Sequence, residues 1–165
     1  MTTFFSADEI FLLGSELERN GEDFYRAAAD CCRAERARKV FEDLCGEERK
    51  HAKTFRSIAD RLSRDMARPM IRDSFSESDL FLTALAETQP LGEDPDEIET
   101  LARECEDDLA LLDLGIDYEK NLLVYYHWVH THTRPEWGQE KLEQIVRQER
   151  EHIIRLNHLR RELHR

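Results

Sequence analysis

A short phrase that occurs twice in this chain constrains its fold more than any other feature of the sequence. Residues 48–51 read Glu-Arg-Lys-His and residues 149–152 read Glu-Arg-Glu-His, at an offset of 101 positions. A lone Glu stands 30 positions before each phrase, at Glu18 and Glu119, so the same offset relates these two residues. The chain therefore contains an internal repeat, and each half contributes one Glu and one Glu-x-x-His motif.

Four long helices are predicted around these residues. Hydrophobic residues recur at spacings of three and four, the pattern of a helix with one buried face. The predicted helices cover residues 7–32, 35–64, 108–130 and 134–163. Each Glu and His of the repeat replaces a hydrophobic residue on the buried face of its helix, with hydrophobic residues one turn away on both sides.

Capping signals mark where two of these helices begin. Ser6, followed by acidic residues, is the expected N-cap of the first helix. Thr133 and Glu136 form a capping-box signature for the fourth helix, with Pro135 in its first turn.

Two helical hairpins, at residues 7–64 and 108–163, are joined by a long connection at residues 65–107. The connection contains signals for short helices, one of them opened by the Asp-Pro pair at 94–95. Some 40 residues are ample to cross a bundle lengthwise. We therefore predict an all-α fold, an antiparallel four-helix bundle of two hairpins with a long, partly helical crossover.

The composition fits a single helical domain spanning residues 1–165. Charged residues make up 36% of the chain, and it has only six Gly and four Pro, which favours long helices. The net charge of −12 argues against a nucleic-acid partner. No apolar run approaches the roughly 18 residues of a membrane span, and the N-terminus lacks a signal-peptide pattern. The four Cys do not form a disulfide framework, so we expect a cytoplasmic protein without a membrane partner.

The repeat supplies a set of candidate metal ligands. They are Glu18, Glu48, His51, Glu119, Glu149 and His152. Unpaired carboxylates in a protein core are strongly destabilising, and two divalent cations would balance four of them, with protonation as the alternative. Oxygen-rich ligation with two imidazoles suits iron or manganese, and zinc could occupy the same site. A single Glu-x-x-His motif means little, but two on buried faces favour a di-metal site.

The symmetry of the repeat predicts how the ligands are shared. Glu48 and Glu149 are expected to bridge two ions about 3.5–4 Å apart. The remaining ligands divide into Glu18 with His51 on one ion, and Glu119 with His152 on the other. Glu47 is next to a ligand but off the predicted buried face, so we expect it to have little influence on metal binding.

Tyr25 and Tyr126 occupy equivalent positions, each seven residues after the lone Glu of its half. This spacing places them two turns further along the buried face. Each is either part of an aromatic core or a hydrogen-bond donor to a metal-bound carboxylate. The sequence leaves both alternatives open.

Residues 7–63 and 108–163 resemble the rubrerythrin-like branch of the ferritin-like di-iron carboxylate superfamily. The resemblance rests on Glu18 with Phe24-Tyr25, on Glu119 with Tyr125-Tyr126, and on the two Glu-x-x-His motifs. It implies a ferritin-like bundle, a pair of non-haem iron ions, and redox chemistry on peroxide or dioxygen.

The chain departs from the rubrerythrin pattern in two respects and from the bacterioferritin pattern in one. It has no Cys-x-x-Cys pair of a rubredoxin module, so an external electron donor such as a rubredoxin-like protein is expected. Leu122 stands where rubrerythrins place an additional Glu, which argues against the full rubrerythrin peroxidase mechanism. Arg49 stands where bacterioferritins have their haem-binding Met, so no haem is expected.

Three functions are compatible with the sequence. The first is a non-haem di-iron oxidoreductase that reduces peroxide or activates dioxygen, acting as a homodimer. The second is a ferritin-like iron-binding protein with a ferroxidase or storage role, for which a large multi-subunit shell is expected. The third is a bundle that keeps its metal only for stability. The first two share the same ligand set, and the long connection favours the first.

Overall fold

The computed structural model of the chain describes residues 6–64, 77–87, 91 and 94–164. Within these residues it contains six α-helices, one short 3₁₀ helix and no strand, so the predicted all-α class is confirmed. The helices are α1 (Ala7–Cys31), α2 (Glu35–Arg64), α3 (Glu77–Glu87), α4 (Pro95–Glu104), α5 (Asp108–His132) and α6 (Gln139–Leu163), and the 3₁₀ helix is η1 (Pro135–Trp137).

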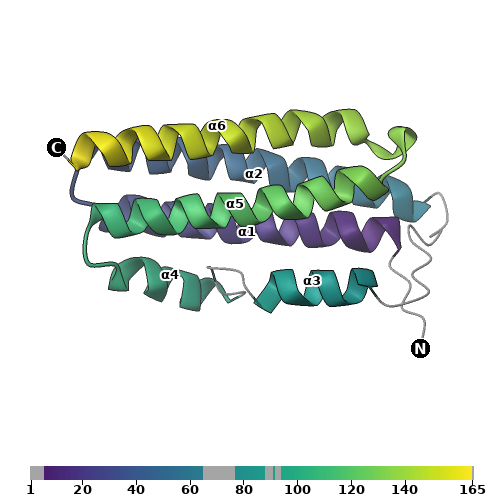
Figure 1. Ribbon diagram of the computed structural model, residues 1–165, viewed down its shortest axis with the longest axis horizontal. Coiled ribbons are helices and arrows are strands. Elements are labelled where there is room, and N and C mark those ends of the chain that lie inside the picture. Colours follow the sequence, from purple (N-terminus) through teal and green to yellow (C-terminus); the bar gives the residue numbers. More distant parts are fainter. Residues whose placement is uncertain (1–5, 65–76, 88–90, 92–93, 165) are drawn as a thin grey trace.

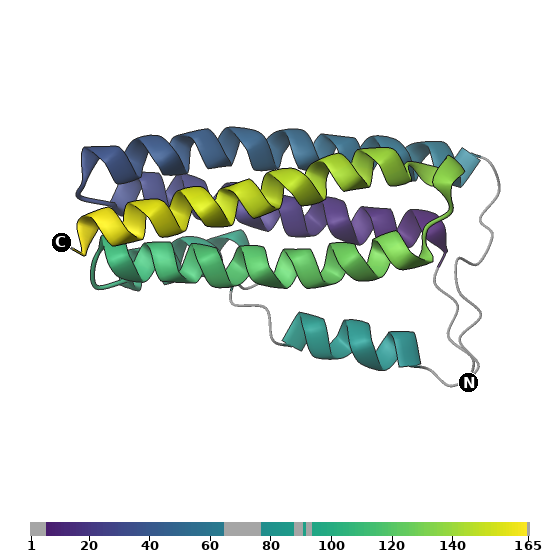
Figure 2. The same cartoon turned by 45° about the horizontal axis from the view of Figure 1, so that its top comes forward.

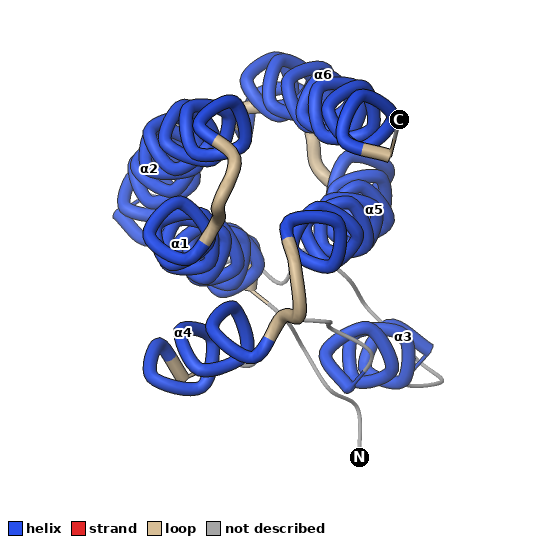
Figure 3. Tube along the Cα trace, turned by 90° about the vertical axis from the view of Figure 1, so that its left-hand side faces the viewer, coloured by secondary structure: helices blue, strands red, loops and turns tan. Residues whose placement is uncertain are grey.

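The long helices α1, α2, α5 and α6 form an antiparallel four-helix bundle (Figure 1). α1 with α2, and α5 with α6, are hairpins joined by short turns. The end view in Figure 3 shows a ring in which α1 lies between α2 and α5, and α6 lies between the same two helices on the opposite side.

The crossover between the hairpins carries two short helices. α3 and α4 follow one another along the outside of the bundle, α4 against α1 and α3 beside α5 (Figure 2). α5 begins at the end of the bundle opposite to the end at which α2 stops (Figure 1). The predicted order of hairpin, lengthwise crossover and hairpin is therefore confirmed.

Side-chain caps account for where α1 and α4 begin. The Ser6 hydroxyl accepts a hydrogen bond from the Glu9 amide at 3.4 Å, and the Glu9 carboxylate accepts one from the Ser6 amide at 2.9 Å. This reciprocal capping box satisfies two amides that the first turn of a helix leaves free. At α4 the Asp94 side chain is the cap and accepts a hydrogen bond from the Asp96 amide at 2.8 Å, with Pro95 as the first helical residue.

The predicted capping box at Thr133 and Glu136 is wrong. Thr133 instead terminates α5, where its hydroxyl donates to the Val129 carbonyl at 2.6 Å. Pro135–Trp137 forms a 3₁₀ turn, and Gly138 has a φ of 103°, a left-handed conformation that ends this turn before α6 begins. The Thr133 hydroxyl is therefore committed to a carbonyl at the end of one helix rather than to an amide at the start of the next.

Close packing of α1 on α2 depends on Gly14. A Cβ atom at this position would lie 2.7 Å from Cδ1 of Phe55, whose ring is fully buried. We expect Gly14→Ala to lower the free energy of unfolding by about 1–3 kcal/mol, because the ring must shift in a close-packed core. Denaturant unfolding measures this change.

Gly46 provides the matched control, because a Cβ there would meet nothing within 4 Å. Alanine is the better helix former, so Gly46→Ala should stabilise the protein by up to about 1 kcal/mol. Equal effects of the two substitutions would show that the contact with Phe55 does not matter.

Across the part of the chain that the structure describes, no helix combines the length and the apolar character needed to cross a membrane.

Candidate metal centre

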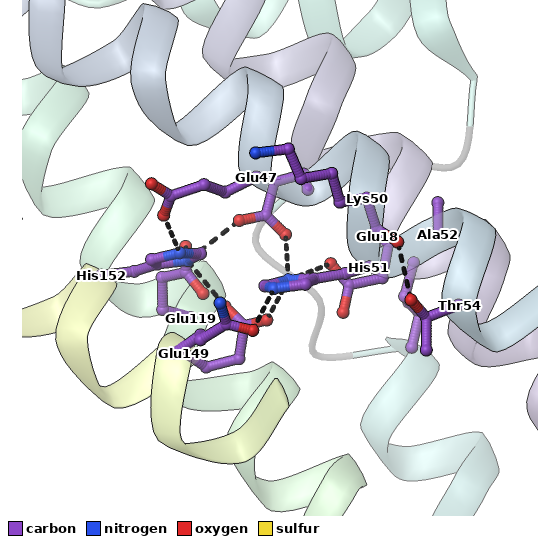
Figure 4. Close-up of polar contacts among 12 residues, drawn as sticks. Glu18, Glu47, Lys50, His51, Ala52, Thr54, Glu119, Glu149 and His152 are labelled. Atoms are coloured by element: carbon purple, nitrogen blue, oxygen red, sulfur yellow. Dashed lines mark hydrogen bonds and ion pairs between the residues drawn. The ribbon is translucent and has the colours of Figure 1, made fainter. Parts of the chain in front are cut away.

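All six candidate ligands meet inside the bundle, one Glu each from α1 and α5, and a Glu and a His each from α2 and α6. They are Glu18, Glu48, His51, Glu119, Glu149 and His152. Figure 4 labels all of them except Glu48. Five of the six are fully buried, and His51 is only 4% exposed. The structure therefore brings together every residue that the repeat singled out.

The six side chains form two overlapping groups of four. One group is Glu18, Glu48, His51 and Glu149, and the other is Glu48, Glu119, Glu149 and His152. Within each group the potential ligand atoms lie within 4.8 Å of one another. Glu48 and Glu149 belong to both groups, so the centre has the ligand arrangement of a di-metal site with two shared carboxylates.

Both histidines turn the same ring nitrogen toward the centre. Nδ1 of His51 lies 2.7 Å from Glu149 Oε1, and Nδ1 of His152 lies 2.7 Å from Glu149 Oε2 and 2.9 Å from Glu48 Oε1. The two rings are stacked, with centroids 5.6 Å apart. Each group of carboxylates therefore includes one imidazole nitrogen, from His51 in one group and from His152 in the other.

The outward nitrogens of the two rings are held by side chains from the opposite hairpin. Nε2 of His152 lies 2.7 Å from the Glu47 carboxylate, and Nε2 of His51 lies 3.1 Å from the Gln148 amide oxygen. A proton on Nε2 makes each of these contacts a hydrogen bond and leaves Nδ1 free as a ligand atom.

Glu47 was expected to lie off the buried face, but its carboxylate contacts the candidate ligand His152. Its side chain is only 31% exposed and points from α2 across to α6, because two facing helices bury a wider stripe than the ligand positions alone occupy. The repeat offers the signal that finds it, since Glu47 and Gln148 are also 101 positions apart. Their different residue types conceal the relation.

The two tyrosines form crossed hydrogen bonds between the hairpins. Tyr25 donates to Glu119 Oε1 at 2.5 Å, and Tyr126 donates to Glu18 Oε1. Burial, reinforced by the nearby carboxylates, raises the pKa of both phenols, so they remain protonated donors. Both rings are also fully buried, so each is part of the core and a partner of a candidate ligand.

Removing one of these donors should weaken metal binding. We expect Tyr25→Phe to lower metal affinity by about 10- to 100-fold, because Glu119 loses the contact that orients it. Tyr125→Phe is the matched control, since its buried hydroxyl donates to the Ile10 carbonyl at 2.6 Å instead. Calorimetric metal titration should show normal affinity for the control, and denaturant unfolding should show that the control loses about 1 kcal/mol of stability.

Eight buried atoms of the six side chains make no hydrogen bond. They are Oε2 of Glu18, both carboxylate oxygens of Glu48, Nδ1 of His51, Oε2 of Glu119, both carboxylate oxygens of Glu149 and Nδ1 of His152. The contacts of 2.7–2.9 Å among them join an imidazole nitrogen to a carboxylate and are ion pairs where the imidazole is protonated. Buried polar atoms nearly always have a hydrogen-bond partner, so eight atoms without one that converge on one place fit cations as their partners.

The electrostatics of the centre favour protons where no cation is bound. Burial, and then the neighbouring carboxylates, raise the pKa of Glu18 and Glu119 well above its usual range. Burial alone would lower the pKa of His51 and His152, but the surrounding carboxylates outweigh it and raise the pKa. For Glu48 burial is likewise outweighed, and contacts with Glu18 and both histidines lower its pKa. Cation binding must therefore displace protons.

Comparison with known proteins bears on the fold. No protein-family model matches the chain, and no curated protein matches it. A crystal structure from Thermotoga maritima, of a protein provisionally assigned as a ferritin-like diiron-carboxylate protein, is similar to it. The TM-score is 0.63 at 24% sequence identity, over 96% of this chain and 97% of the other. The chain therefore has a ferritin-like fold.

Proposed function

We propose that this centre binds two divalent metal ions and that the native ions are iron. The observation that carries the proposal is the set of eight buried ligand atoms without a hydrogen-bond partner, in two groups that share Glu48 and Glu149. Glu18 with His51 would complete one ion's ligands, and Glu119 with His152 those of the other. Four carboxylates and two imidazoles suit iron, with manganese or zinc as substitutes.

We propose further that the protein is a non-haem di-iron oxidoreductase of the rubrerythrin-like type, which reduces peroxide or activates dioxygen. Two bound irons would supply two electrons to an O–O bond, and an external donor would restore them. The chain's own residues orient the centre: Tyr25 and Tyr126 hold Glu119 and Glu18, and the bundle excludes bulk water from it. The residue pattern shared with rubrerythrins supports this activity.

A depression between α2 and α6 offers a small substrate an approach to the centre. It has a volume of about 350 Å³, and His51 and Gln148 are among its lining residues with the charged side chains Glu47, Lys50 and Arg155. Hydrogen peroxide and dioxygen are small enough for such a path, whereas a larger substrate would have to displace the histidine. This supports a diatomic or peroxide substrate.

Anaerobic reconstitution with Fe²⁺ tests both proposals. We expect two irons per chain, followed by oxidation of a reduced artificial electron donor when hydrogen peroxide is added. The Glu48→Ala variant should show neither. Wild-type protein that holds two irons yet reacts with neither peroxide nor dioxygen would overturn the oxidoreductase proposal and leave a purely structural metal centre.

The same ligands would also serve a ferritin-like protein that oxidises and stores iron. The size of the particle separates the two functions, because storage requires a closed shell of many subunits. The two helices of the crossover, α3 and α4, lie outside the bundle and make this segment more than a plain connection. We therefore propose a homodimeric enzyme, for which light scattering should give the mass of two chains of 19.5 kDa.

A further inference from the structure

The two halves of the centre are matched in their ligands but not in the groups behind the histidines. His152 Nε2 faces a carboxylate, that of Glu47 at 2.7 Å, whereas His51 Nε2 faces the neutral amide oxygen of Gln148 at 3.1 Å. The crossed tyrosine contacts and the six ligands have the same residue types in both halves. The charge behind one imidazole is thus a clear departure from the internal symmetry.

A second departure positions the Glu47 carboxylate. Arg155 Nη1 lies 3.0 and 2.9 Å from the two oxygens of Glu47 and holds the carboxylate in place against His152. The position equivalent to Arg155, 101 residues earlier, is Thr54, whose hydroxyl donates to the Lys50 carbonyl of its own helix. Figure 4 shows Glu47 reaching His152 while Thr54 points away from the centre.

We propose that Glu47 makes the two metal positions unequal, so that the Glu119–His152 position binds a divalent cation more tightly and fills first. This inference rests on the proposed metal centre. A hydrogen bond to a carboxylate is roughly twice as strong as one to a neutral acceptor. A carboxylate that accepts a hydrogen bond from one nitrogen of a ligating histidine also makes the other ring nitrogen more basic, so this nitrogen binds a cation more strongly. Gln148 fixes the orientation of His51 but adds no negative charge.

A purely structural role for Glu47 is the competing explanation. Glu47 and Arg155 would then only tie α2 to α6, through side chains that are 31% and 33% exposed. Ion pairs this exposed contribute little to stability, on the order of 0–1 kcal/mol. A structural tie predicts a change in unfolding without a preference between the metal positions, so the two explanations have different consequences.

Partial loading of the intact protein tests the inference. Crystals grown with about one Co²⁺ per chain should show anomalous scattering mainly at the Glu119–His152 position. A calorimetric Co²⁺ titration should resolve two steps whose affinities differ by about 10- to 100-fold. Metal affinity typically changes by this factor when a ligating histidine loses its carboxylate partner. Glu47→Gln should make the two positions nearly equal, and the Glu47→Gln/Gln148→Glu double variant should reverse the order of filling.

Glu42→Gln is the matched control, because it removes the same charge from an exposed position on α2. It should leave both steps unchanged. Equal occupancy of the two positions in the wild type, or an order of filling that the exchange leaves unaltered, would overturn the inference while the metal centre stands. Protein that binds no Co²⁺ at these ligands would contradict the proposed centre itself, and the inference with it.

Discussion

Glu48→Ala should abolish stable binding of both metal ions, whereas Glu18→Ala should weaken one ion far more than the other. Glu48 belongs to both groups of ligand atoms, and Glu18 belongs to one. Loss of a shared carboxylate would also remove a negative charge from between the two proposed cations. We expect the affinity for both ions to fall by more than about 100-fold. This loss is larger than the one expected when a ligating histidine loses its hydrogen-bond partner.

Elemental analysis after dialysis and calorimetric titration measure this difference. Glu42→Ala serves as the control, because Glu42 is exposed on the same helix. Circular dichroism should show a folded Glu48→Ala protein, since the substitution removes a buried carboxylate that has no hydrogen-bond partner. A Glu48→Ala variant that retains two ions would show that Glu48 does not bridge them.

Metal should stabilise the folded protein, and the gain should grow as the pH rises. Free cation at about 1,000 times its Kd adds about 4 kcal/mol per independent site to the free energy of unfolding. In the metal-free fold the pKa values are raised for four groups, Glu18, Glu119, His51 and His152. The fold therefore holds protons that the unfolded chain releases near the typical pKa values of about 4.3 for Glu and about 6.5 for His. Cations must displace these protons, so acidification weakens binding.

The sign of the effect on the metal-free protein follows from the same groups. Above about pH 4.3 the folded state binds more protons than the unfolded state, so its stability falls as the pH rises toward the raised pKa values. We therefore expect melting temperatures in chelator to decline between about pH 5 and 8, while the increment due to added Mn²⁺ increases. An increment that is independent of pH would show that these groups are not the metal ligands.

The sequence predicted the bundle well because its strongest signals are periodic. A buried face on each of four helices, repeated at an offset of 101, determines which side chains meet once the hairpins pack. The positions of Glu18 and His152 in the core follow from this pattern alone. A cap made between neighbouring residues, such as Ser6 with Glu9, can also be predicted from the sequence because the contact is local.

Contacts between hairpins were harder to predict. Whether Glu47 faces solvent or His152 depends on how α2 and α6 are rotated against each other, which helical periodicity determines only to within about one residue. The prediction of a capping box at the end of α5 was wrong for a different reason. Thr133 has the residue type of an N-cap, and only the left-handed conformation of Gly138 shows that the helix starts later.

Neither hairpin contains a complete position for an ion. Each group of four ligands draws on both hairpins, and one of the shared carboxylates, Glu149, lies on α6, the last helix of the bundle. A chain emerging from the ribosome therefore presents the first hairpin long before it can hold metal. Under the proposed function, acquisition of the ions would follow synthesis of α6 and its docking, so metal content would measure how many chains have completed folding.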